Sequence, residues 1–334
     1  MTKVAINGMG RIGRATLKII LETPELDLVA VNDIAPRDVI VYLLKYDTAY
    51  GKYSKSVELD GDDLIVNGQH IKFLQERDPA QLPWKELGVD IAIESTGFFI
   101  DKAGLEKHLE AGAKFVVLSA PSKGEGIPTI VHGVNTPPPD AKMLSCASCT
   151  TNSITPVVEI IGRRLGLQKA MLTTIHAYTS TQSIVDGPNK KMRRGRAAAA
   201  NFVPTTTGAA VATTRVLPQY AGKFNGVAVR APIPVGSISD LVFLTEKDTT
   251  VEEVNQILRE EAASDKYRGI FLASDEELVS SDIVGETHGS IADLGMTRVV
   301  DGNLVKIMAW YDNEWGFTSQ MIRETLRVAQ EKGF

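Results

Sequence analysis

The stretch Gly8-Met-Gly10-Arg-Ile-Gly13 decides the fold of the first half of the chain. The apolar run at residues 3–7 that precedes it is typical of a buried strand, and the apolar residues of 14–22 recur at helical spacing. In a G-x-G-x-x-G turn the first glycine makes the turn, the second lets the backbone approach a pyrophosphate, and the third allows the helix to contact the strand. The pattern predicts a strand, a turn and a helix that together bind a dinucleotide.

A second apolar run, residues 28–31, ends at Asn32 and Asp33. Asp33 lies about 20 residues after the last glycine, where this pattern places an acidic residue. A carboxylate there accepts hydrogen bonds from both ribose hydroxyls and repels a 2′-phosphate. The sequence therefore favours NAD over NADP.

The rest of the chain divides into two regions of different character. Apolar runs at 89–93 and 115–118 flank a helical segment at 102–111, which continues the alternation of strand and helix to about residue 148. Short alternating runs around Gly61 and Gly68 suggest an antiparallel insertion. The later strand-like runs, at 170–175, 226–231, 239–244 and 304–310, predict a second, α+β domain with a mostly antiparallel sheet, and 315–332 predicts a terminal helix.

Composition excludes several classes of protein. The chain has 334 residues, enough for two ordinary domains, and is 43% hydrophobic and 23% charged. A net charge of -5 argues against a protein that mainly coats nucleic acid or an acidic membrane, and no apolar run is long enough to span a bilayer. Two cysteines cannot staple a chain of this size, so we expect a reducing, cytoplasmic location.

Both cysteines lie in Ser145-Cys-Ala-Ser-Cys-Thr-Thr-Asn152, and three interpretations compete for them. A zinc site needs about four ligands, and no second Cys or His group stands at a suitable spacing, so we expect no metal. A thioredoxin-like pair belongs after the first strand of its fold, which is not the case here. The apolar residues after Cys149 predict a helix that begins near it, and a helix N-terminus favours the thiolate, so Cys149 is a candidate nucleophile.

A cysteine nucleophile needs a proton acceptor nearby. His176 ends the strand-like run 172–176, where catalytic groups are often placed, but from its spacing it could equally be a buried structural histidine. The other four histidines lie in turn-like, helical or polar contexts, and none is a strong candidate.

Five separated motifs resemble phosphorylating glyceraldehyde-3-phosphate dehydrogenases: INGMGRIGR at the N-terminus, SCTTN at 148–152, HAYT at 176–179, PTTTGAA at 204–210 and WYDNEWGF at 310–317. The resemblance runs from end to end in the order of the family. It implies an α/β protein with a doubly wound Rossmann domain at 1–148 that binds NAD, and an α+β catalytic domain at 149–312. Residues 313–334 would form a C-terminal helix that packs back on the NAD-binding domain.

The resemblance also implies a reaction, in which glyceraldehyde 3-phosphate, inorganic phosphate and NAD give 1,3-bisphosphoglycerate and NADH. Cys149 would attack the aldehyde, and His176 would remove the hydroxyl proton as hydride leaves, which yields a thioester that phosphate cleaves. Erythrose 4-phosphate is the alternative substrate, since a close relative shares these motifs.

By motif match, Thr179 and Arg230 would hold the substrate phosphate. The attacking phosphate would be held by Ser148, Thr207, Gly208 and Arg194, and Thr150 is implied as a further substrate- or phosphate-binding residue. Arg194 is the least secure assignment, because Arg193 and Arg196 stand beside it in a basic run at 190–196. That run could also be a solvated loop or a nucleic-acid patch. In the family it belongs to a loop at a subunit contact, which implies a homotetramer rather than nucleic acid as the main partner.

On the cofactor side, the resemblance implies contacts from the glycine turn, the ribose-binding carboxylate, the cleft and the nicotinamide end, namely Gly8, Gly10, Arg11, Ile12, Gly13, Asp33, Arg77, Ser119 and Asn313. Three features depart from the family: Cys146 where Asn is common, Met9 where Phe is common, and a longer glycine-rich segment at 122–128. Cys146 is either an inert buried thiol or a partner that captures oxidised Cys149 as a disulfide.

Overall fold

The computed structural model describes all residues from Met1 to Phe334 and divides the chain into two compact units. The first unit consists of Met1–His132, Thr136–Ala147 and Met321–Phe334, and the second of Gly133–Asn135 and Ser148–Gln320. The two chain ends lie side by side in the first unit, where Thr2 Oγ1 donates a hydrogen bond to the Phe334 carbonyl at 3.2 Å.

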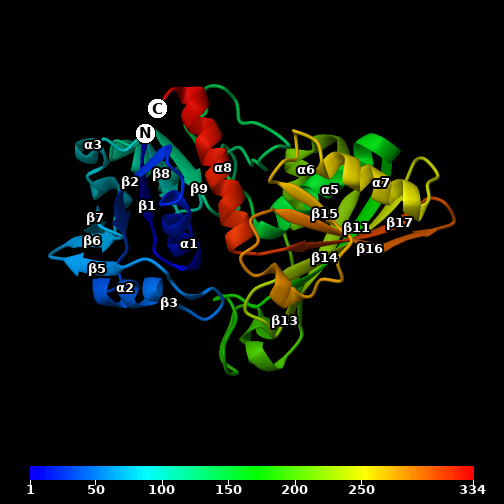
Figure 1. Cartoon of the computed structure of the whole chain (residues 1–334), viewed down its shortest axis with the longest axis horizontal. Helices are drawn as coiled ribbons and strands as arrows, with labels where there is room; N and C mark the ends of the chain where they lie inside the picture. Colours follow the sequence, from blue (N-terminus) through cyan, green and yellow to red (C-terminus); the bar gives the residue numbers. More distant parts are fainter. The chain divides into compact units, whose positions relative to one another are not determined.

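The first unit is built on an eight-stranded sheet (Figure 1). Across the sheet the strands are β10 (Met143–Ser145), β9 (Phe115–Leu118), β8 (Ile91–Glu94), β1 (Thr2–Asn7), β2 (Leu26–Asn32), β7 (Gln69–Leu74), β6 (Asp63–Val66) and β5 (Val57–Asp60). The strands from β10 to β7 are parallel, and β8 and β9 are buried along their whole length, as expected of a parallel sheet covered on both faces. This confirms the expected doubly wound sheet.

The helices and short elements of the first unit connect these strands. They are α1 (Arg11–Ile20), α2 (Arg37–Lys45), β3 (Tyr46–Asp47), β4 (Gly51–Lys52), η1 (Pro79–Gln81), α3 (Trp84–Leu87) and α4 (Lys102–Glu110). The chain winds outward from β1 to β2 in one direction and from β8 to β10 in the other. The direction reverses between β1 and β8, which is where open α/β sheets bind their ligands.

The predicted antiparallel insertion differs from the structure in one respect. The strand β6 pairs antiparallel with both β5 and β7, as expected, but β7 also pairs in parallel with β2. The insertion therefore extends the main sheet and does not form a separate layer.

Steric crowding explains the glycine turn. Gly8 has a φ of +97°, and a Cβ built on it would lie 2.6 Å from the Thr96 amide nitrogen. A Cβ on Gly13 would lie 1.8 Å from the Gly8 carbonyl oxygen, whereas one on Gly10 would meet no atom within 4 Å. Helix α1 begins at Arg11 and not at residue 14 as predicted, because the turn is shorter than the apolar pattern suggests.

The second unit contains a seven-stranded sheet. Its strands, in order, are β12 (Val203–Thr206), β13 (Phe224–Ala231), β11 (Leu167–Ala177), β14 (Ser237–Thr245), β17 (Leu304–Tyr311), β16 (Ser290–Val300) and β15 (Phe271–Ser274). Two pairs, β11 with β13 and β15 with β16, are parallel, and the other pairs are antiparallel. The expected α+β unit with a mostly antiparallel sheet is confirmed.

The helices of the second unit cover the buried face of this sheet or follow its edges. They are α5 (Cys149–Leu165), α6 (Ala209–Val216), α7 (Val251–Ala262) and the short turns η2 (Met192–Gly195), η3 (Ala198–Ala200), η4 (Pro218–Tyr220) and η5 (Ser280–Ile283). Burial alternates along β14, and α5 packs on β14, β16 and β17. The apolar face of α5 therefore fixes the position of its first residue, Cys149.

The terminal helix α8 (Trp315–Lys332) occurs as predicted. Its later part, from Met321 onward, belongs to the first unit, where Met321, Ile322 and Val328 are buried.

Candidate active site

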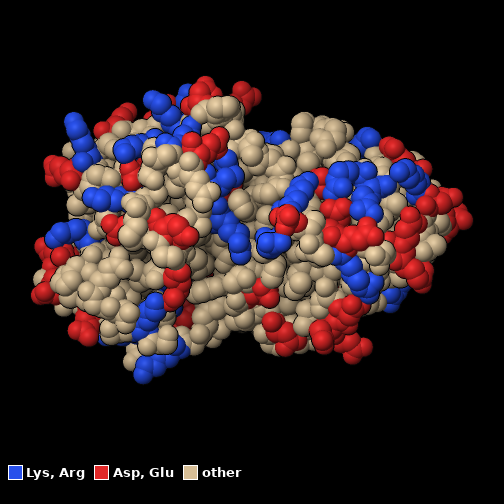
Figure 2. Space-filling model, turned by 45° about the horizontal axis from the view of Figure 1, so that its top comes forward, with Lys and Arg blue, Asp and Glu red and all other residues tan.

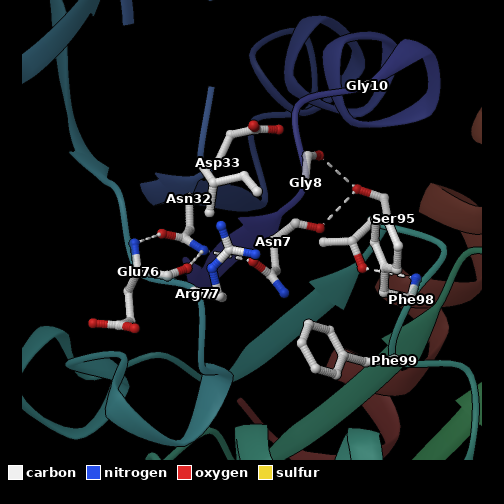
Figure 3. Close-up of a pocket in the computed structure, with 12 residues that line it drawn as sticks. Asn7, Gly8, Gly10, Asn32, Asp33, Glu76, Arg77, Ser95, Phe98 and Phe99 are labelled. Carbon is white, nitrogen blue, oxygen red and sulfur yellow. Dashed lines mark hydrogen bonds between the residues drawn. The ribbon is translucent and has the colours of Figure 1, made fainter. Parts of the chain in front are cut away.

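A cavity of about 430 Å³ lies at the carboxyl ends of the parallel strands of the first unit (Figure 3). Its lining comes from the segments that follow β1, β2, β7 and β8, and consists of Asn7, Gly8, Gly10, Asn32, Asp33, Ile34, Glu76, Arg77, Ser95, Thr96, Phe98 and Phe99. The structure thus brings together four of the predicted cofactor residues, Gly8, Gly10, Asp33 and Arg77. The others, Arg11, Ile12, Gly13, Ser119 and Asn313, do not line this cavity.

The carboxylate of Asp33 is held at the cavity by backbone amides. Its Oδ2 accepts a hydrogen bond from the Met9 amide at 2.6 Å, and its Oδ1 accepts one from the Ala35 amide at 2.8 Å. Each carboxylate oxygen has a second lone pair, so the group can still accept two ribose hydroxyls. Phe98, whose side chain is 84% exposed, adds an apolar surface that an adenine ring can cover. The residues present therefore fit the adenosine half of a dinucleotide.

The side chain of Arg11, a residue predicted at the pyrophosphate, bonds to another part of the first unit. Its guanidinium pairs with Asp47 at 2.5 Å and lies over the Tyr50 ring. The side chain therefore lies against the β3–β4 hairpin. Of the predicted cofactor residues in the second unit, Asn313 accepts hydrogen bonds through Oδ1 from the Gly236 amide at 3.2 Å and from Ser237 Oγ at 3.1 Å.

In the second unit, Cys149 and His176 face each other. Cys149 is the first residue of α5, and the Ser148 hydroxyl caps that helix by accepting a hydrogen bond from the Thr151 amide at 3.1 Å. His176 lies near the end of β11 and is 5% exposed. The Cys149 Sγ is 3.3 Å from His176 Nε2, which is hydrogen-bonding distance for sulfur. The sequence alone could not choose between a structural and a functional His176, and this contact favours the functional one.

Both members of the pair are neutral in this geometry. Burial, followed by the charge of Arg230, lowers the pKa of His176 to about 3. Burial also raises the pKa of Cys149, although Arg230 and the Thr150 amide act in the opposite direction. The expected preference of the helix N-terminus for thiolate is thus outweighed by burial.

Two contacts at His176 Nδ1 bear on the tautomer of the ring. Arg230 Nη1 lies 2.5 Å from Nδ1, and the Ala177 carbonyl lies 2.6 Å from it. Arginine can only donate and a carbonyl can only accept, so the two neighbours favour opposite tautomers. With the proton on Nδ1, directed at Ala177, His176 Nε2 is free to take a proton on the side of Cys149.

Tyr311 supports this pair and was not identified as a site residue from the sequence. Its hydroxyl lies 2.9 Å from Thr150 Oγ1 and 2.8 Å from Thr174 Oγ1, and its ring meets the His176 imidazole edge-on at 5.9 Å. Thr150 was predicted to hold phosphate, but its hydroxyl is buried and directed to Tyr311. A tyrosine in the motif WYDNEWGF offers no spacing signal that would have revealed this contact.

Several groups in the second unit have the chemistry to bind an anion. Arg194 Nε donates to Thr205 Oγ1 at 3.0 Å and its Nη1 donates to Thr181 Oγ1 at 3.2 Å. Thr181 Oγ1 in turn lies 2.9 Å from Thr179 Oγ1. The charge of Arg194 also lowers the pKa values of both His176 and Arg230, so the two guanidinium groups act on the same small region. Two nearby cations with hydroxyl neighbours can hold anions close to the thiol.

The neighbours of Arg194 are placed differently. Arg196 pairs with Asp186 at 2.8 Å, and Arg193 is exposed. Thr207 Oγ1 accepts a hydrogen bond from the Ala209 amide at 3.2 Å, next to Gly208 at the start of α6. The structure therefore separates Arg194 from Arg193 and Arg196, which the basic run 190–196 could not do.

The second thiol, Cys146, is 3% exposed and is not in a disulfide. Burial and the carboxylate of Glu324 raise its pKa well above the usual range. A thiol is a weak nucleophile until it loses its proton, so Cys146 attacks an oxidised neighbour only slowly. Its capture of Cys149 stays a prediction.

The charged side chains of the surface form no further site of these kinds. Lys and Arg side chains are interspersed with Asp and Glu over the face drawn in Figure 2. No group of three or more His, Cys, Asp or Glu side chains is placed to hold a metal ion, and no helix is sufficiently long and apolar to cross a bilayer.

Comparison with known proteins gives a consistent result across the chain. Residues 2–102 match the model of the glyceraldehyde 3-phosphate dehydrogenase NAD binding domain, and residues 148–313 match that of the C-terminal domain. Proteins named glyceraldehyde-3-phosphate dehydrogenase are 49% identical in Thermotoga maritima (98% of this chain, 99% of that protein) and 47% identical in Geobacillus stearothermophilus (98% of each). The protein of that name in Streptomyces coelicolor is 46% identical, over 98% of this chain and 99% of its own length.

Proposed function

Because the chain belongs to the glyceraldehyde-3-phosphate dehydrogenase family, we propose that it oxidises glyceraldehyde 3-phosphate to 1,3-bisphosphoglycerate with NAD and inorganic phosphate. It is an oxidoreductase that binds NAD. The observation that carries the phosphorylating mechanism is the 3.3 Å contact between Cys149 Sγ and His176 Nε2 beside two arginines. Erythrose 4-phosphate, the alternative substrate, is not favoured, since the relatives reported above are named for the triose phosphate.

The first chemical step makes the aldehyde able to lose hydride. His176 Nε2 accepts the Sγ proton, Cys149 adds to the carbonyl carbon, and the proton passes to the new oxygen to give a hemithioacetal. His176 then removes that hydroxyl proton as the C–H electron pair departs, and a thioester remains on Cys149. NAD, when bound, supplies the hydride acceptor.

The second step transfers the acyl group. A phosphate oxygen attacks the thioester carbon, the C–S bond breaks, and the acyl phosphate leaves Cys149 as thiolate. The imidazolium of His176 returns its proton to Sγ or to solvent. Arg230 lies on the opposite edge of the imidazole from Cys149 and stabilises the sulfur anion through its charge.

We propose two anion sites for the two phosphates. Thr179 and Arg230 hold the phosphate of the substrate, while the attacking phosphate is held by Arg194 together with Ser148, Thr150, Thr207 and Gly208. The hydrogen bonds of Arg194 to Thr205 and Thr181 support its choice over the neighbouring arginines. The contact of Thr150 with Tyr311 supports a positioning role beside its proposed role in phosphate binding.

For the cofactor, we propose that the amides of Gly8, Gly10, Arg11 and Ile12 face the pyrophosphate, and that Gly13 lets α1 approach closely enough for this. Asp33 and Arg77 contact the adenosine half, Ser119 contacts the cofactor outside this cavity, and Asn313 contacts the nicotinamide amide. The position of Asp33 and Arg77 on the same cavity supports the adenosine assignment.

We further propose that the protein acts as a homotetramer in the cytoplasm. The loop before β12 leaves large apolar side chains in solvent, with Ile184 83% exposed, Met192 89% and Phe202 71%. Apolar side chains gathered in this way are typical of subunit interfaces. A reducing compartment keeps the Cys149 thiol active. Light scattering during size-exclusion chromatography tests the tetramer, and a monomer at micromolar concentration would contradict it.

The decisive experiment measures phosphate-dependent NADH formation from glyceraldehyde 3-phosphate. The wild-type protein should form NADH only with phosphate present, Cys149→Ser should bind NAD but form almost none, and the matched control Cys146→Ser should retain activity. The ratio of kcat/KM for glyceraldehyde 3-phosphate and erythrose 4-phosphate identifies the substrate. Turnover by Cys149→Ser, or a ratio that favours the tetrose, would overturn the proposal.

A further inference from the structure

A buried chain of polar side chains runs behind the cofactor cavity of the first unit. Asn7, Asn32 and Glu94 are the last residues of β1, β2 and β8, and they stand at paired positions of the sheet. Each is at most 3% exposed, and Trp84 and His108, which continue the chain, are completely buried. The catalytic mechanism uses none of these five residues.

Trp84 fixes the tautomer of His108. The indole nitrogen can only donate, and Trp84 Nε1 donates to His108 Nδ1 at 3.0 Å. The imidazole proton must therefore be on Nε2, which lies 3.1 Å from Glu94 Oε2. His108 is consequently a hydrogen-bond donor toward Glu94.

Glu94 receives hydrogen bonds from four donors. Its Oε2 accepts from His108 and from Asn7 Nδ2, the latter at 2.6 Å, and its Oε1 accepts from the amide and the hydroxyl of Thr96 at 2.7 and 2.5 Å. Only a group that accepts at both oxygens fits this site. Thr96 itself lines the cofactor cavity.

The carboxylate sets the direction of the two amides that follow. Because Asn7 uses its NH2 group on Glu94, its Oδ1 faces Asn32 and accepts from Asn32 Nδ2 at 2.7 Å. Asn32 in turn makes two hydrogen bonds to the backbone of Glu76: its Nδ2 donates to the Glu76 carbonyl, and its Oδ1 accepts from the Glu76 amide, both at 2.8 Å. Figure 3 shows Asn7, Asn32 and Glu76 joined in this order, with Arg77 next to them at the cavity.

We propose that Glu94, oriented by His108 and Trp84, is a positioning residue for the adenosine half of NAD. It holds two walls of the cavity in register. One wall, the segment of Glu76 and Arg77, is linked to Glu94 through the two asparagines, and the other, the segment that begins at Thr96, is bonded to Glu94 directly. Since every link is an oriented donor–acceptor pair, one wrong group at position 94 misaligns both walls. The inference rests on the placement of NAD in this cavity.

Glu94→Gln tests the proposal, because it replaces one of the two acceptor oxygens by an NH2 group. Whichever oxygen is replaced, the new NH2 group faces two hydrogen-bond donors. The wild-type protein and the variant are titrated with NAD and with ADP-ribose by calorimetry, and their kinetics are measured. We expect the dissociation constants of both ligands and the KM for NAD to rise at least tenfold. The kcat at saturating NAD should stay within about twofold of wild type, since the chemical groups lie elsewhere.

A second buried carboxylate of the first unit supplies the control. Glu324 is 1% exposed and bonds to His132 and Arg327, away from the cavity. Glu324→Gln should lower the melting temperature without changing the affinity for ADP-ribose. Trp84→Phe keeps an aromatic ring but frees the tautomer of His108, and should weaken ADP-ribose binding a few-fold; this variant decides if Glu94→Gln does not fold.

Unchanged ADP-ribose affinity in folded Glu94→Gln, or an equal loss in Glu324→Gln, would overturn the proposal. A fall in kcat with unchanged KM for NAD would overturn it also. Because the binding of ADP-ribose does not involve glyceraldehyde 3-phosphate, this result is independent of the proposed reaction.

Discussion

Arg230 Nη1 lies 2.5 Å from Nδ1 of His176, while Cys149 Sγ faces Nε2 of the same ring. One guanidinium therefore influences two acid–base groups in ways that help the reaction. Burial and the Arg230 charge together lower the pKa of His176, which keeps the imidazole neutral, and the same charge opposes the rise in the pKa of Cys149 that burial causes.

Arg230→Leu should therefore slow alkylation of Cys149 at neutral pH several-fold, because without the guanidinium charge the pKa of Cys149 rises further and less thiolate is present. The rate of reaction with iodoacetamide is measured from pH 6 to 10. The curve for the variant should shift to higher pH, and the buried Cys146 should not react in either protein. A coincident curve would show that Arg230 does not stabilise the thiolate.

The depressed pKa of His176 makes the stability of the protein depend on pH. In the unfolded chain the ring titrates near 6.5, whereas in the folded protein its pKa is about 3, so between these values only the unfolded state binds the proton. Stability is then lost as the pH falls from about 6.5 toward 3, by up to about 1.4 kcal/mol per pH unit for this group. His176→Asn should remove that part of the slope in urea unfolding between pH 6 and 4. Parallel slopes for the two proteins would contradict the neutral, buried state of the ring.

Two glycines of the glycine turn should have different roles, one in folding and the other in NAD binding. Gly13→Ala should destabilise the protein severely, because the new Cβ would overlap the Gly8 carbonyl oxygen, whereas Gly10→Ala has open space on the protein side. Gly10→Ala should fold with a nearly unchanged melting temperature but bind NAD at least tenfold more weakly, since a methyl group stands where the backbone must approach the pyrophosphate. Calorimetric unfolding and NAD titration measure the two effects, and normal NAD binding by Gly10→Ala would argue against that approach.

The three arginines of the basic run should differ in their effect on phosphate. Arg194→Ala should raise the KM for phosphate by one to two orders of magnitude, because a charge-assisted contact to an anion contributes about 1.5–3 kcal/mol. Arg193→Ala, an exposed neighbour, is the matched control and should leave that KM unchanged. Equal effects of the two substitutions would mean that the run acts only through its overall charge.

Much of the fold could be predicted from local patterns in the sequence. The glycine turn, the alternation of strands and helices, and the terminal helix were evident because each depends on residues close together in the chain. The strand β16 and the helix α7 were not foreseen, and β16 is interrupted by a register shift between Asp293 and Arg298 that breaks its pattern. The pairing of β7 with β2 also escaped prediction, because strand order depends on contacts that spacing does not encode.

In the candidate site, too, local features could be predicted from the sequence and long-range contacts could not. Asp33 was predictable from a fixed distance to the glycine turn, whereas the contact of Tyr311 with Thr150 joins residues 161 apart and leaves no local signal. The direction in which burial moves the pKa of Cys149 was also beyond the sequence, because desolvation depends on the whole surrounding structure.

The burial of Cys146 has a practical consequence for enzymology. The chain has only two thiols, and one of them is sealed from solvent with its pKa raised. A single equivalent of an alkylating reagent should therefore be consumed by each competent subunit of the native protein. Titration with such a reagent counts working active sites directly, so turnover numbers can be expressed per functional site instead of per mass of protein.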